Sequence, residues 1–147
     1  MSLSLFEMEN RIERIQEGFE VQAIDLVERT TLRIQITESY LESLKDLLGN
    51  KDSDPMIKTA IAYLECDIDI AKNEKTTKLL NELGNVANND ELQILLETYW
   101  PHLDSVETVR EKRYQYYDFE LSRYAKAHDI KEKFYGPNLQ AIEKDIK

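Results

Sequence analysis

Residues 5–27 read LFEMENRIERIQEGFEVQAIDLV, and apolar side chains recur along this stretch at steps of three and four. They are Leu5, Met8, Ile12, Ile15, Phe19, Ala23, Leu26 and Val27. This spacing is typical of an α-helix that buries one face. The pattern resumes at residues 40–48, and the strand-like alternation of TTLRIQIT between them (residues 30–37) has no partner strand. The sequence therefore predicts one helix over residues 5–48, about 65 Å long at 1.5 Å per residue.

A stop signal follows this helix at Gly49 and Asn50, before the polar run KDSD. Asp54 is a candidate N-cap for the next helix, because its side chain can accept hydrogen bonds from the backbone. Pro55 suits the first helical position. A second helix is therefore predicted to begin at residue 54.

This second helix is predicted to cover residues 54–128, kinked or broken in two places. Gly84 and the following NVANND predict a disturbance near residues 84–90. Pro101 predicts a kink, since proline lacks the backbone N–H, while the apolar pattern continues beyond it in the same phase. After a turn at Gly136 and Pro137, a short helix is predicted over residues 138–147.

The composition supports an all-α fold. Only 4 Gly and 3 Pro occur in 147 residues, too few for the many tight turns of a β-sandwich. The helices are long and amphipathic, so we expect them to pack as antiparallel partners in an elongated coiled-coil bundle. The whole chain, residues 1–147, is predicted to be one domain.

Charge is distributed unevenly along the chain. The net charge is −10, with 10 acidic and 5 basic residues in residues 1–49, the same numbers in residues 50–100, and 9 of each in residues 101–147. Because nucleic-acid binding depends on neutralising phosphates with cations, we expect no nucleic-acid partner. Any anionic partner is expected to meet the last third of the chain.

Location and chemistry are constrained mainly by what the sequence lacks. Cys66 is the single cysteine, which suits a reducing compartment, and no secretory signal or membrane-spanning run is apparent, so a cytoplasmic protein is expected. His102 and His128 have no ligand spacing typical of zinc or di-iron sites, and the glycines form no phosphate loop. Acidic pairs such as Asp67 and Asp69 are interpreted as solvated helix faces or helix caps. No cofactor, metal or catalytic site is therefore expected.

One pair of residues suggests a different class of protein. Arg123 and His128 form an R-x4-H pair that resembles the motif of HEPN ribonucleases, with the arginine as a phosphate ligand and the histidine as acid or base. Tyr124 stands where that family usually has a polar residue beside the arginine. A lone match of this kind is weak, because any helix rich in Arg and His can produce it.

Tyrosines and cations gather late in the sequence. Tyr114, Tyr116, Tyr117 and Tyr124 stand among Arg110, Lys112, Arg113, Arg123 and Lys126, with Lys131 and Lys133 beyond them. The tyrosines can simply pack along a helix seam while the cations stay in water. Alternatively, the same combination suits an anionic lipid surface.

The order of segments resembles the BAR domain of sorting nexins, a family of curved, three-helix coiled-coil dimers. The resemblance lies in LESLKDLLGNKDSDP, MIKTAIAYLECDI, ELGNVANNDELQILLETYW and VETVREKRYQYYDFELSRYAKA, followed by a loop at FYGPN. The chain has no PX domain, the module that precedes the BAR domain in that family, and its third helix would be truncated at Lys147.

This resemblance implies roles for named residues. The tip of the crescent would hold membrane-binding cations at Arg123, Lys126, Lys131 and Lys133. The apolar stripes would form the bundle core and the dimer interface, and their members are Ile12, Ile15, Phe19, Leu41, Leu44, Ile61, Leu64, Leu96, Leu103 and Val106.

The expected function is that of a non-enzymatic helical module that forms homo- or heterodimers. The resemblance implies that it helps to sense or shape endosomal membranes, as a peripheral protein together with other trafficking proteins. The alternative is a coiled-coil adaptor whose acidic first two-thirds bind a basic protein partner, with no membrane role; salt would weaken that binding sharply.

Overall fold

The computed structural model describes residues 2–128, and this part of the chain is built of α-helices. The helices are α1 (Phe6–Gln16), α2 (Leu26–Asp46), α3 (Asp54–Lys72), α4 (Glu74–Leu83) and α5 (Asn89–Ala127). The prediction of an all-α fold is confirmed. The predicted helix at residues 138–147 lies outside the described residues.

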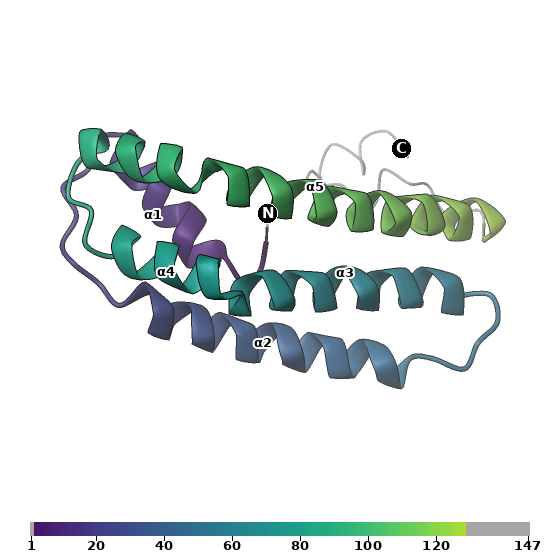
Figure 1. Ribbon diagram of the computed structural model, residues 1–147. Helices are drawn as coiled ribbons and strands as arrows, with labels where there is room; N and C mark the ends of the chain where they lie inside the picture. The colour runs from purple at the N-terminus through teal and green to yellow at the C-terminus, as the bar shows by residue number, and fades with distance from the viewer. Residues whose placement is uncertain (1, 129–147) are drawn as a thin grey trace, which may run out of the picture.

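The helices form three antiparallel layers (Figure 1). α2 runs in one direction, α3 and α4 return end to end as the middle layer, and α5 runs back along them. α1 crosses one end of this stack, near α4 and the start of α5. Its buried residues, Met8, Arg11 and Ile15, close that end of the hydrophobic core.

The predicted helix over residues 5–48 is in fact two helices. α1 ends at Gln16, and Gly18 adopts a left-handed conformation with φ +87°. The N–H of Gly18 donates to Ile15 O (3.1 Å) and that of Phe19 to Arg14 O (3.0 Å). These two bonds form a Schellman motif, a helix-ending arrangement that favours glycine at this position. Apolar periodicity continues through the break, so it did not reveal the glycine stop.

Phe19 was predicted as a member of the apolar stripe, but the break after α1 places it outside the core. It lies beyond α1, is 54% exposed, and has the Arg14 guanidinium 5.2 Å from its ring centroid. Ile15, Leu41, Ile61 and Leu64 are buried in the core. The other predicted members are partly buried and pack against that core; these are Ile12, Leu44, Leu96, Leu103 and Val106.

The segment predicted over residues 54–128, kinked or broken near residues 84–90, is three helices; the break between α4 and α5 lies where the sequence indicated one, whereas the break at Asn73 was not predicted. Asn73 separates α3 from α4, and its side chain caps α4 by accepting from the Lys75 N–H (2.9 Å). The chain then reverses between Leu83 and Asn89, so that α5 returns antiparallel to α3 and α4. α5 itself continues through Pro101. The kinked helix expected for this segment is therefore a helical hairpin.

The start of α5 has a local explanation. The Asn88 side chain accepts from the Glu91 N–H (3.0 Å), and Glu91 reaches back to accept from the Ala87 N–H (2.9 Å). This reciprocal pattern is close to a capping box, which fixes a helix start. Asp54, the predicted N-cap of α3, instead accepts from Gly49 N–H (2.9 Å) and Asn50 N–H (3.2 Å), and so closes the α2–α3 loop.

Arg11 anchors α1 to the segment in which the chain reverses between α4 and α5. The guanidinium is 4% exposed and donates to the carbonyls of Leu83, Gly84 and Val86 at 2.9–3.0 Å, and to that of Gln22 at 3.0 Å. Three of these carbonyls lie at the C-terminal end of α4, where the helix dipole favours a cation. Burial lowers the pKa of Arg11. No carboxylate is among these contacts. Hydrogen bonds to backbone carbonyls therefore compensate the cost of burying the Arg11 charge.

Candidate functional site

The solvent-facing side of α5 is the first candidate surface. Exposed residues recur along it at steps of four and three, and they are Ile94, Thr98, Pro101, Ser105, Val109, Lys112, Tyr116, Phe119 and Arg123. These steps place them on one side of the helix, here called the outer face of α5. Tyr116 is 52% exposed and Phe119 66%. Only Leu92, Leu95 and Ala125 of the whole helix are buried, so α5 presents most of its surface to solvent.

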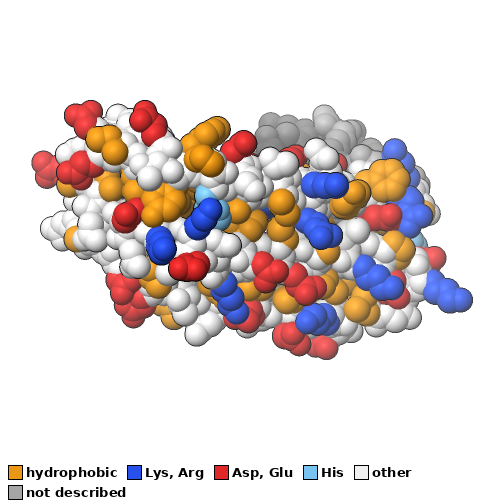
Figure 2. Space-filling view, viewed as in Figure 1, with side chains coloured by type: hydrophobic (Ala, Val, Ile, Leu, Met, Phe, Trp, Pro, Cys, Tyr) orange, Lys and Arg blue, Asp and Glu red, His pale blue; other side chains and the backbone are white. Residues whose placement is uncertain are grey.

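The outer face of α5 contains two cations and no carboxylate, although the chain has a net charge of −10. Figure 2 shows the same bias on one side of the molecule: Lys and Arg side chains are frequent around the C-terminal end of α5, and Asp and Glu side chains dominate the opposite end. The last third of the sequence has equal numbers of acidic and basic residues, but the outer face of α5 carries only basic ones.

Two of the four predicted membrane-binding cations lie in the described part of the chain. Arg123 and Lys126 are both exposed near the end of α5. The Arg123 guanidinium is 2.8 Å from the Glu120 carboxylate in an ion pair along the helix. Lys131 and Lys133 lie outside the described residues.

The tyrosines divide between packing and exposure. The ring of Tyr114 meets Tyr63 of α3 edge to face at 5.8 Å and Tyr117 at 6.4 Å. Tyr124 lies against His128, with 4.3 Å between ring centroids. Tyr116 points outward instead. Tyr114 therefore packs against other rings although 46% of its surface is exposed, and Tyr116, 52% exposed, is available for contact with lipid or a partner.

Arg123 and His128, the pair that resembles a ribonuclease motif, line one cleft of about 280 Å³ together with Lys51. Arg123 already pairs with Glu120, which lines the same cleft. A phosphate at this position would have to compete with that carboxylate. The cleft brings the two residues together, with Lys51, Asp52 and Glu120 in the same lining.

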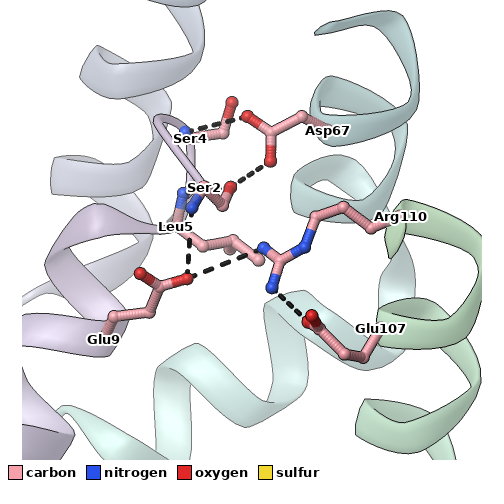
Figure 3. Close-up of polar contacts among 7 residues, drawn as sticks. All are labelled: Ser2, Ser4, Leu5, Glu9, Asp67, Glu107 and Arg110. Carbon is pink, nitrogen blue, oxygen red and sulfur yellow. Dashed lines mark hydrogen bonds and ion pairs between the residues drawn. The ribbon is translucent and has the colours of Figure 1, made fainter. Parts of the chain in front are cut away.

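A buried polar junction joins the N-terminal segment to α3 (Figure 3). Asp67 is 1% exposed; it accepts a hydrogen bond from the Ser2 hydroxyl and another from the Ser4 N–H at 3.1 Å. The Ser4 hydroxyl donates to Thr37 of α2 (3.2 Å). The interpretation of Asp67 as part of a solvated face was wrong, since its side chain satisfies buried donors inside the core.

Next to this junction, Arg110 of α5 reaches α1 (Figure 3). Its guanidinium pairs with Glu107 and lies 3.6 Å from Glu9. Burial alone would lower the pKa of Arg110, but Glu107 and Glu9 raise it above its ordinary value. Arg110 is therefore held cationic between two carboxylates from different helices.

A cleft of about 260 Å³ opens beside Arg110. Leu5, Met8 and Ile70 are buried residues in its wall, and Leu103 and Val106 of α5 are partly buried there. Trp100 stands at this cleft with 62% of its surface exposed. We call this cleft the α1–α5 socket. Its wall is largely apolar, while its charged members come from α1 and α5.

Sequence reasoning missed Arg11, Asp67 and the pair formed by Arg110 and Glu9. A signal existed for Asp67, because it stands three residues after Leu64 and one before Ile68, on the side of α3 that is otherwise apolar. Arg11 likewise directly precedes Ile12 in a core-facing stretch. A charged residue on an apolar helix face indicates a buried polar contact, but periodicity does not identify the partner.

His102 and Cys66 are two further residues whose side chains are capable of acid–base or nucleophilic chemistry. His102 Nε2 lies 2.9 Å from the Thr76 hydroxyl of α4, and burial followed by the nearby Lys75 lowers its pKa. Burial raises the pKa of the partly buried Cys66 thiol. Among residues 2–128, no group of three His, Cys, Asp or Glu side chains is placed to hold a metal ion. No helix in this range is long and apolar enough to cross a bilayer.

No family model, curated protein or solved structure matches this chain.

Proposed function

We propose that this chain is a non-enzymatic helical dimerisation module that contacts an anionic membrane through the outer face of α5. The observation that carries the proposal is the charge of that face, which includes Lys112 and Arg123 and no Asp or Glu in a chain of net charge −10. Such a local reversal of sign favours an anionic partner, because each cation gains free energy near an anionic surface.

The N-terminal half of the outer face suits pairing with another helix. From Ile94 to Val109 it is exposed and carries no charged residue. α5 packs mainly against α3, on its other side. A second helical chain, like or unlike, would bury Ile94 and Val109, which are exposed among the described residues.

The C-terminal half of the outer face suits a lipid surface. Lys112, Tyr116, Phe119 and Arg123 are all exposed on one side of the helix. Aromatic side chains favour the boundary between lipid headgroups and acyl chains, and cations are attracted to anionic headgroups. The net charge of −10 opposes this contact, so binding is expected to depend strongly on these few residues.

The endosomal setting and the association with other trafficking proteins are proposed from the resemblance to sorting-nexin BAR domains alone. That resemblance implies one long kinked helix at residues 54–128, whereas the structure contains the α3–α4 and α5 hairpin. The proposal accordingly includes pairing and lipid contact, and no particular curvature.

Vesicle sedimentation tests the lipid contact. The chain is expected to sediment with vesicles of phosphatidylserine and phosphatidylcholine, and not with phosphatidylcholine alone. Lys112→Gln combined with Arg123→Gln should weaken binding roughly 30-fold, at about 1 kcal/mol for each cation. The matched control is Lys45→Gln with Lys78→Gln, which removes the same charge from exposed positions on α2 and α4. Equal loss in both double variants would contradict a specific role for α5.

Light scattering tests the pairing. Dimer mass is expected for the wild type, and monomer mass for Ile94→Asp with Val109→Asp, because a charge at either position would be buried in the dimer. Leu32→Asp, at an exposed position on α2, serves as control and should remain dimeric. A wild-type chain that stays monomeric at all concentrations would exclude self-pairing.

The alternative function, an adaptor for a basic protein partner, is favoured by a different observation. Acidic side chains dominate the end of the molecule opposite the C-terminus of α5 (Figure 2). This alternative requires neither vesicle binding nor the outer face of α5. The α1–α5 socket offers it a specific site.

A further inference from the structure

The α1–α5 socket is a second binding surface, which does not depend on the outer face of α5. Its wall combines Leu5 and Met8 from the first residues of the chain with Ile70 of α3 and Leu103 and Val106 of α5. Residues far apart in sequence therefore build one apolar recess. Unlike a surface stripe, it has depth, with a volume of about 260 Å³.

The size of the socket limits what can enter it. Small-molecule and cofactor sites generally span roughly 300–1,000 Å³. At about 260 Å³ the socket is smaller, and suits one large apolar side chain of a protein partner. Single aromatic or aliphatic side chains that fill pockets commonly act as anchors at protein interfaces.

Trp100 gives the socket an aromatic edge. It is 62% exposed, although it belongs to the socket lining and stands next to the partly buried Tyr99. Tryptophan is enriched among residues that dominate binding energy, because it offers a large apolar surface with one N–H donor. An incoming chain that covers Trp100 would remove this apolar surface from water.

The charges around the socket determine which sign of charge a partner must carry. Glu9, Asp104 and Glu107 contribute three carboxylates, and Arg110 contributes one guanidinium, which leaves a local charge of −2. Arg110 is already engaged by Glu9 and Glu107. Charge complementarity therefore favours a cationic partner. A second copy of this chain, with net charge −10, fits poorly here.

We propose that the α1–α5 socket binds a basic helical segment of a partner protein, which inserts one apolar side chain between α1 and α5. Lys or Arg side chains next to that anchor meet Asp104, Glu9 and Glu107, and the segment covers Trp100. The mode is that of an amphipathic helix on a groove, with an apolar anchor and charged flanks.

Trp100 also provides the readout, since it is the chain's single tryptophan. The probe is a synthetic amphipathic peptide of Leu and Lys with one central Phe and no Trp. Binding should shift the emission of Trp100 towards shorter wavelength as the indole leaves water. Two matched peptides are compared with it: one carries Glu in place of every Lys, and the other carries Ala in place of Phe. Both are expected to bind at least about tenfold more weakly.

Two variants on α5 complete the test. Asp104→Lys reverses one charge at the socket, and Asp118→Lys makes the same change at an exposed position away from it. Peptide binding should weaken roughly tenfold in Asp104→Lys and stay near wild type in Asp118→Lys. Both variants alter exposed positions, so circular dichroism should show an unchanged helical fold.

The outcomes separate this proposal from the proposed function. Equal weakening in the two variants would show general attraction to an acidic protein and would overturn the site. Equal binding of the Lys and Glu peptides would overturn the charge argument. Vesicle binding lost through Lys112 and Arg123 but kept in Asp104→Lys shows that the outer face of α5 and the socket are independent surfaces.

Discussion

Arg11 is the residue through which α1 reaches both the loop before α2 and the end of α4. Its guanidinium satisfies four backbone carbonyls inside the protein. A buried carbonyl that loses its donor costs roughly 1–3 kcal/mol. Arg11→Met is therefore expected to lower the free energy of unfolding by at least about 3 kcal/mol. Chemical denaturation measures this.

Arg14→Met is the control for that substitution, because Arg14 is exposed on the same helix and lies over Phe19. It should change stability by no more than about 0.5 kcal/mol, as is usual for surface positions. Arg11→Lys separates charge from geometry. An ammonium cannot span the carbonyls that the planar guanidinium reaches, so Arg11→Lys should resemble Arg11→Met.

Gly84 is required by close backbone approach and not by an unusual φ. A Cβ at this position would overlap the carbonyl oxygen of Ile24, whose own N–H donates to Gly84 O at 3.0 Å. Gly84→Ala should destabilise the fold by about 1–3 kcal/mol, because backbone on both sides must shift. Thermal unfolding should show a lowered Tm. Asn85→Ala, at the next and exposed position, should stay close to wild type.

At the scale of elements, His102 links α5 to α4 through Thr76. Burial, with Lys75 nearby, lowers the pKa of His102 below its ordinary value of 6.5. The folded state thus disfavours the protonated ring. Its contribution to stability is complete above 6.5 and is lost as the pH falls from there through the folded-state pKa.

His102→Gln tests this linkage, because glutamine keeps a polar group beside Thr76 and does not titrate. Wild-type stability is expected to fall more steeply with decreasing pH than that of His102→Gln, in denaturation curves measured on both sides of pH 6.5. Carboxylates titrate alike in both proteins, so the difference between the two curves reports His102. Parallel curves would contradict the assignment.

The helices themselves were predictable in kind, and the break near residues 84–90 was indicated, but the stops at Gly18 and Asn73 were not. Periodicity identified apolar faces at Ile15, Leu41 and Ile61, which the core buries. It could not show the stop at Gly18, because the apolar spacing runs through it unchanged. Nor could it distinguish a kink from a reversal at residues 84–88, since that depends on how Arg11 and Ile24 hold the turn from a distance.

The candidate surfaces were likewise predictable only where they depend on one helix. The exposure of Arg123 could be predicted from sequence, because exposure and charge are local properties of a helix. The α1–α5 socket could not, although Leu103 and Val106 had been predicted as apolar contacts. Its other wall comes from Leu5 and Met8, and only the fold brings these beside α5.

At the scale of the whole molecule, acidic residues outnumber basic ones by 29 to 19. Packing this excess into one bundle causes self-repulsion, which salt screens over a distance of about 10 Å at 0.1 M ionic strength. Adding sodium chloride to a low-salt buffer should therefore raise the Tm. A Tm that falls with salt would mean that attractive ion pairs outweigh the repulsion. Differential scanning calorimetry distinguishes the two.

The fastening of α1 also has a consequence for the order of folding. Arg11 joins residues 72–75 positions later in the chain, and Ser2 meets Asp67 across 65 positions. Closing such long loops costs more entropy than forming the α2–α3 and α4–α5 hairpins, whose partners are neighbours in sequence. We therefore expect α1 to dock late, onto hairpins that are already formed. Since Leu5 and Met8 complete the socket, the capacity to bind a partner there would arise only in the final step, and a chain that stalls before it would be helical yet unable to bind.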